Sequence, residues 1–79
     1  MMRLAHGFDP VLSALAIDRL RLYAERKLAR DIRETSENIG VILYYHAQAI
    51  AFTKKIKQIE AIETKMRAAR RAAKRAAYL

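Results

Sequence analysis

The sequence predicts an all-α protein of two long helices, about residues 10–38 and 41–77, packed as an antiparallel hairpin. The chain is 53% hydrophobic, with only two glycines and one proline in 79 residues, a composition typical of helix. Apolar residues recur every three or four positions, and one polar run near the middle interrupts them. We expect a single domain over 1–79 that begins with an N-terminal arm, residues 1–8. The alternative is one long helix continuing through Gly40.

The first helix is expected to begin at Pro10. The preceding Asp9 can accept hydrogen bonds from the unpaired backbone N–H groups of the first turn, and proline at the first helical position gives up a donor that has no partner there. The apolar positions predict an amphipathic helix with one exposed face. The charged residues mostly between them are Asp18, Arg19, Glu25, Arg26, Arg30 and Arg33. Those apolar positions are Leu12, Leu15, Ile17, Leu20, Ala24, Leu28 and Ile32.

The turn is expected between Thr35 and Gly40. Serine and asparagine side chains compete with the helical backbone for hydrogen bonds, and glycine in a helix costs about 1 kcal/mol. We therefore predict that Gly40 ends the first helix as a left-handed cap.

The second helix carries an apolar line that steps by three and four residues from Ile42 to Ile59, which is the spacing of a coiled coil. After Ile59 the apolar line continues through Ile62, which indicates a three-residue stammer. A second apolar stripe alongside the first predicts that a hairpin leaves one face for a partner helix or a second copy. The expected interface residues are Ile42, Tyr44, Tyr45, Ala49, Ile50, Phe52, Ile56 and Ile59.

The formal charge of +8 is unevenly distributed along the chain. Residues 1–40 hold seven basic and six acidic residues, whereas residues 41–79 hold nine basic and two acidic residues. This asymmetry predicts an acidic partner for the C-terminal half, either nucleic acid, an anionic membrane or an acidic protein.

The sharpest signal is the acid-free C-terminal segment, residues 64–79, which we expect to project beyond the shorter first helix. Most of its cations share one side of the helix, within roughly 140°. Arginine side chains suit phosphate, and no asparagine or glutamine accompanies them to read base edges. We therefore predict contact with nucleic acid that does not depend on base sequence. The predicted contact residues are Lys65, Arg67, Arg70, Arg71, Lys74 and Arg75.

The sequence carries no pattern that indicates catalysis. There is no cysteine, and His6 and His46 lie forty residues apart without nearby carboxylate clusters, so neither a metal site nor a nucleophile is expected. We expect no enzyme activity, cofactor or small-molecule substrate. A membrane-surface role is disfavoured because alanine, which buries little area, lies opposite the cations.

The leading hypothesis is a small helical assembly protein that self-associates, or packs on a helical partner, and contacts nucleic acid through its basic C-terminal helix. The alternative is a protein-interaction module, such as an inhibitor or adaptor of the kind that phages encode, which docks an apolar helix on a host or structural protein. The expected location is the cytoplasm or a viral or other nucleoprotein assembly.

Overall fold

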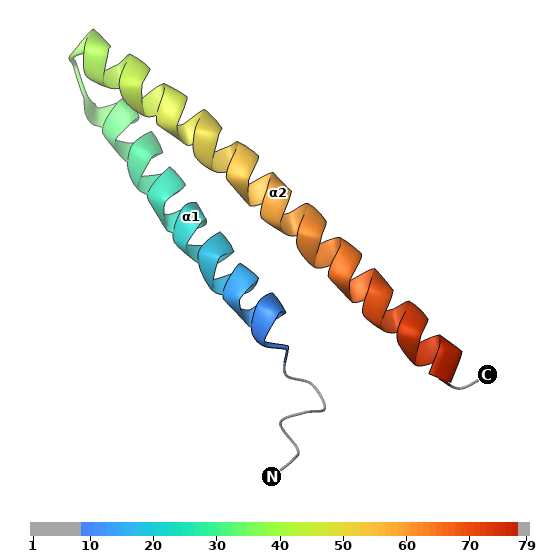
Figure 1. Cartoon of the computed structure of the whole chain (residues 1–79). Helices are drawn as coiled ribbons and strands as arrows, with labels where there is room; N and C mark the ends of the chain where they lie inside the picture. The colour runs from blue at the N-terminus through green and yellow to red at the C-terminus, as the bar shows by residue number, and fades with distance from the viewer. Residues whose placement is uncertain (1–8, 78–79) are drawn as a thin grey trace.

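The computed structural model describes residues 9–77, which form two helices joined by a short turn. Helix α1 spans Pro10–Thr35 and helix α2 spans Ile39–Ala77. The two helices run antiparallel and pack along the length of α1 (Figure 1). The predicted all-α hairpin is confirmed, and the alternative of one continuous helix is wrong because the chain reverses at the turn. The N-terminal arm predicted for residues 1–8 lies outside the described residues.

Helix α1 begins where Asp9 and Pro10 predict. One carboxylate oxygen of Asp9, Oδ1, accepts hydrogen bonds from the backbone N–H groups of Val11 (2.9 Å) and Leu12 (3.1 Å). Pro10 occupies the first helical position, where a missing N–H costs nothing. The cap therefore fixes the start of α1 by local chemistry alone.

The turn is set by Asn38, and the prediction of a left-handed cap at Gly40 is wrong. Helix α1 ends at Thr35, three residues earlier than expected, because Ser36 adopts an extended conformation (φ −83°, ψ 145°). The Asn38 side chain Oδ1 accepts a hydrogen bond from the backbone N–H of Val41 (3.1 Å), which makes Asn38 the N-cap of α2. Gly40 lies in the first turn of α2 without a positive φ.

The apolar line of α2 packs against α1 and keeps its three- and four-residue steps beyond Ile59. The next positions on this line are Glu63, which is 2% exposed, and Met66, whereas Ile62 is 47% exposed. The predicted stammer is therefore wrong. The buried Glu63 occupies the position in the contact with α1 that the apolar pattern assigns to Ile62.

Helix α1 packs through a face that keeps Leu12 and Leu15 of the predicted apolar set but leaves most of the others exposed. Ile17, Leu20 and Leu28 are about 60% exposed, whereas three arginines spaced seven residues apart are part-buried against α2. Arginine can lay its aliphatic stem over an apolar surface while its guanidinium reaches a polar partner. The contact line of α1 consists of Leu12, Leu15, Arg19, Leu22, Arg26, Ala29 and Arg33.

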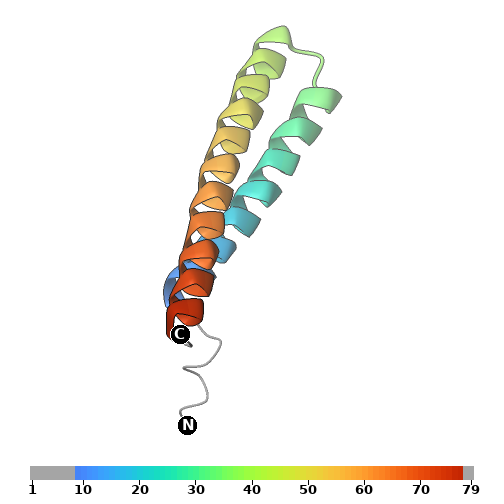
Figure 2. The same cartoon turned by 90° about the vertical axis from the view of Figure 1, so that its right-hand side faces the viewer.

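The hairpin is a single layer, with Cα extents of 61 × 26 × 12 Å (Figures 1 and 2). Among the described residues only Ala29, Ala49 and Ile56 are buried apolar residues. Protein cores normally form between two packed layers. Both broad faces of this layer are consequently open to solvent.

Candidate nucleic-acid interface

The C-terminal end of α2 extends past the start of α1 (Figure 1). The last cation that reaches α1 is Arg70, whose Nη1 lies 3.8 Å from Asp9 Oδ2. Asp9 thus caps α1 with one carboxylate oxygen and faces α2 with the other. The remaining turns of α2, residues 71–77, are exposed throughout and extend roughly 10 Å beyond this pair.

The predicted contact residues do not all lie on one side of α2. At about 100° per residue, Arg67, Arg71, Lys74 and Arg75 fall within about 60° of Thr53, whereas Lys65 falls about 120° from it. We call these four cations the basic stripe. All four are exposed, and none has an acidic partner within 4.0 Å among the described residues. Arg70 lies between the stripe and α1.

A groove of about 600 Å³ opens between α1 and α2 on the same side as the basic stripe. Its floor includes the buried Ala49, and cations from both helices surround it. Glu34 is its single acid. The groove is lined by Arg30, Arg33, Glu34, His46, Ala49, Ile50, Thr53, Lys54 and Lys57. We call the side that carries this groove and the basic stripe the basic face.

Arg33 is held in place at the edge of the groove. Its Nη1 lies 3.0 Å from Nδ1 of His46, and its Nη2 lies 3.8 Å from the Glu34 carboxylate. Arg26 makes a similar contact, donating through Nη1 to the hydroxyl of Thr53 at 3.2 Å. These contacts tie the two helices together on the basic face and leave the other groove cations to solvent.

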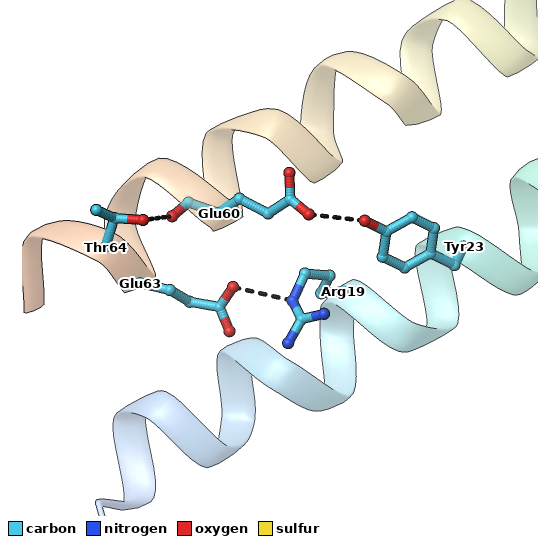
Figure 3. Close-up of polar contacts among 5 residues, drawn as sticks. All are labelled: Arg19, Tyr23, Glu60, Glu63 and Thr64. Carbon is cyan, nitrogen blue, oxygen red and sulfur yellow. Dashed lines mark hydrogen bonds and ion pairs between the residues drawn. The ribbon is translucent and has the colours of Figure 1, made fainter. Parts of the chain in front are cut away.

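Two acids of α2 are engaged by α1 between the groove and the stripe (Figure 3). Arg19 Nε donates to Glu63 Oε1 at 2.9 Å, while the other oxygen, Oε2, is buried without a hydrogen-bond partner. The hydroxyl of Tyr23 donates to Glu60 Oε2 at 2.7 Å. This hydrogen bond, together with partial desolvation and the negative charge of Glu60, raises the pKa of Tyr23 above its ordinary value of 10.0.

The opposite broad face carries aromatic side chains, and its charged residues are of both signs. A groove of about 230 Å³ there is lined by Leu28, Tyr44, Tyr45 and Phe52 among others. The two tyrosine rings meet edge to face with centroids 5.0 Å apart. A neighbouring groove contains charges of both signs, including Asp18, Arg21 and Lys55. We call this side the aromatic face.

The eight predicted interface residues divide between the inside and the outside of the hairpin. Ala49 and Ile56 are buried against α1, so they are not available to a partner in this conformation. Tyr44 and Ile50 are 58% and 52% exposed, on the aromatic and basic faces respectively. The others, Ile42, Tyr45, Phe52 and Ile59, are half-buried along the contact line.

Sequence reasoning missed the groove because Arg30 and Lys54 are far apart in the chain, and only the register of the hairpin brings them together. The available signal was the seven-residue spacing of Arg19, Arg26 and Arg33, which marks a packed arginine line.

Among residues 9–77 no group of three or more histidine, cysteine, aspartate or glutamate side chains is arranged to hold a metal ion. In the same part of the chain neither helix has an apolar stretch long enough to cross a membrane. Comparison of the chain with protein-family models, curated proteins and solved structures found no match.

Proposed function

We propose that this protein is a small helical assembly protein that binds the phosphate backbone of nucleic acid through the basic C-terminal end of α2. The observation that supports this most is the basic stripe, in which exposed cations follow one side of a helix without an acidic partner. Helix-dipole complementation favours one or two cations in a last turn, but it does not account for a stripe that begins at Arg67.

The stripe favours backbone contact over base reading. Arginine and lysine charges neutralise phosphates and release counterions, which gives binding that weakens steeply with salt. Base-specific contact needs side chains such as asparagine or glutamine placed in a groove, and the stripe contains only arginine and lysine besides alanine. Binding is therefore expected to be similar for different base sequences of the same length.

Elution from a DNA column by a salt gradient tests the nucleic-acid proposal. We expect the Arg71→Ala/Lys74→Ala variant to elute at clearly lower salt than the wild-type protein. A matched control, Arg21→Ala/Lys55→Ala, removes one arginine and one lysine from the aromatic face and should elute near the wild-type position. Equal shifts for both variants would mean that net charge, not the stripe, determines retention.

We further propose that the aromatic face packs on a second copy of the chain. Among the described residues only Ala29, Ala49 and Ile56 are buried apolar side chains, whereas Leu28 and Tyr44 of the aromatic face are 61% and 58% exposed. A second layer would give the hairpin the core that it lacks.

The distribution of charge favours the aromatic face for this contact. Two copies meeting through their basic faces would bring like charges together, which is unfavourable. The aromatic face carries Asp18, Glu25, Arg21 and Lys55, so a two-fold copy offers charges of both signs to each subunit. This arrangement leaves the basic faces of both copies outward.

A protein-interaction module remains the second candidate, because the same exposed apolar groove also fits a helix from another protein. The specific observation is that Leu28 and Tyr44 stay about 60% exposed although they line one groove. A protein that stays monomeric at high concentration would favour this candidate over self-association.

A further inference from the structure

The groove on the basic face contains cations that the hairpin itself does not use. Arg33 is engaged by His46 and Glu34, and the nearby Lys27 pairs with Asp31 at 3.0 Å. In contrast Arg30, Lys54 and Lys57 are exposed and have no acidic partner within 4.0 Å among the described residues. Three uncompensated cations from two helices therefore surround one concave surface.

His46 adds a neutral donor to the same groove. Arginine can only donate hydrogen bonds, so the imidazole must accept at Nδ1 from Arg33, 3.0 Å away. A histidine that accepts at Nδ1 in its neutral form carries its proton on Nε2, which leaves that N–H available as a donor. The groove thus offers charged and neutral donors, the combination that phosphate oxygens accept.

The groove and the basic stripe lie on one side of the same helix. Lys57 and Arg71 are separated by fourteen residues, about 21 Å along α2, which matches roughly six phosphates of one strand at 3.4 Å per phosphate. Of the two acids between them, Glu63 is buried against Arg19, whereas Glu60 accepts the hydrogen bond of Tyr23 and stays exposed. The cations of the groove and of the stripe therefore lie on either side of a single exposed carboxylate.

We infer that the groove is a second phosphate-backbone site, so that nucleic acid lies lengthwise along the basic face rather than on the C-terminal end alone. This inference rests on the proposed nucleic-acid function and extends it to Arg30, Lys54 and Lys57. An acidic protein segment is less suited to the surface, because the cations extend over more than 20 Å and match a repeating line of phosphates better than one short acidic cluster.

The test measures binding of a fluorescent 20-base-pair DNA duplex by anisotropy over a series of salt concentrations. The groove variant is Arg30→Ala/Lys57→Ala, and its matched control is Arg21→Ala/Lys55→Ala on the aromatic face. Each variant removes one arginine from α1 and one lysine from α2. Circular dichroism melting curves of both variants verify that the hairpin still forms.

We expect the groove variant to bind roughly tenfold more weakly at low salt and to lower the slope of log K against log salt by about 1.8, because each lost phosphate contact removes about 0.9. Because Arg21 and Lys55 lie on the face proposed for self-association, the control is compared at a protein concentration at which sedimentation shows the same association state as the wild type. Under that condition the control should change affinity by less than about twofold. A groove variant that matches the control, while Arg71→Ala/Lys74→Ala loses binding, overturns this inference and leaves the proposed function intact.

Two further outcomes separate the inference from the function on which it rests. Wild-type protein without salt-dependent DNA binding overturns both. Stronger binding of poly-glutamate than of the duplex, lost in the groove variant, identifies the groove as a site for acidic protein and overturns the inference. Loss of duplex affinity in the groove variant, with unchanged melting, supports it.

Discussion

At the scale of single residues, the most consequential side chain is Glu63, a carboxylate that is 2% exposed and has one oxygen without a partner. Burying a charge is costly, and a single ion pair repays the cost only with good geometry and further hydrogen bonds. Arg19 provides one 2.9 Å contact and keeps 26% of its own side chain exposed. We therefore expect the pair to specify the register of the hairpin more than it stabilises the fold.

The cost of burying the Glu63 carboxylate predicts that substitutions of Arg19 and of Glu63 change the free energy of unfolding in opposite directions. Arg19→Ala leaves the buried carboxylate uncompensated and should lower the free energy of unfolding by about 2 kcal/mol. Glu63→Leu removes the buried charge while Arg19 can still reach water, and should raise the free energy of unfolding by about 1 kcal/mol. Urea unfolding followed by circular dichroism, at one fixed protein concentration, measures both. A larger loss in Glu63→Leu than in Arg19→Ala would contradict this account of the seam.

Tyr23 gives a prediction about pH. Its hydrogen bond to Glu60 raises the pKa of Tyr23 above 10.0 in the folded protein, so the contact stabilises the fold below pH 10 and is lost as the pH rises through the higher folded value. The difference in tyrosinate absorbance between the wild-type protein and Tyr23→Phe reports this titration. In Glu60→Ala, which removes the acceptor, the pKa of Tyr23 should fall, and an unchanged value would show that the contact with Glu60 does not cause the shift.

At the scale of elements, the N-cap of α1 was the most predictable feature because its chemistry is local. Asp9 before Pro10 predicted the start of α1 at the residue where it is found. The turn was less predictable, because Ser36, Asn38 and Gly40 each can end or begin a helix. The side-chain hydrogen bond of Asn38 to Val41 decided between them, and no propensity scale contains that contact.

Substitutions of Asp9 should separate its two roles, which are to cap α1 and to pair with Arg70. Asp9→Ala removes the hydrogen bonds to the first turn of α1 and should cost about 1 kcal/mol of stability. Asp9→Asn keeps a capping oxygen but loses the charge that faces Arg70, and should stay within about 0.5 kcal/mol of the wild type, since an exposed ion pair contributes little. Thermal melts monitored by circular dichroism compare them. Equal destabilisation by both variants would mean that the ion pair, not the cap, holds the start of α1.

The contact face of α1 could not be read from its apolar residues. Ile17, Leu20 and Leu28 are spaced as a buried stripe would be, yet each is about 60% exposed. The contact line instead includes three arginines. Their aliphatic stems cover apolar area, and their guanidinium groups contact Glu63, Thr53 and His46. A pattern that scores arginine as exposed therefore assigns the wrong residues to the contact face of such a helix.

At the scale of the whole molecule, the sequence predicted the fold class and the hairpin but not its two unlike faces. The C-terminal stripe was visible because its residues are close in the chain. The groove was not, because it forms only when Arg30 lies opposite Lys54 and Lys57. The proposed division, with the basic face for nucleic acid and the aromatic face for a second copy, follows from this register.

Exposed apolar residues on each face provide a matched test of the assembly. Tyr44 and Ile50 are similarly exposed, at 58% and 52%, but line grooves on the aromatic and basic faces respectively. We expect Tyr44→Glu to shift the protein towards monomer, because burying an unpaired charge opposes association, whereas Ile50→Glu should remain a dimer. Sedimentation velocity at several concentrations distinguishes the two, and the reverse outcome would move the interface to the basic face.

The central claim joins these two faces, and light scattering of the pure wild-type protein with and without a DNA duplex tests it most directly. We expect a mass near twice the 9.1 kDa of one chain in the absence of DNA. At low salt, added duplex should give a heavier complex that dissociates as the salt concentration rises. A mass of one chain that does not change when duplex is added at low salt would contradict both halves of the account.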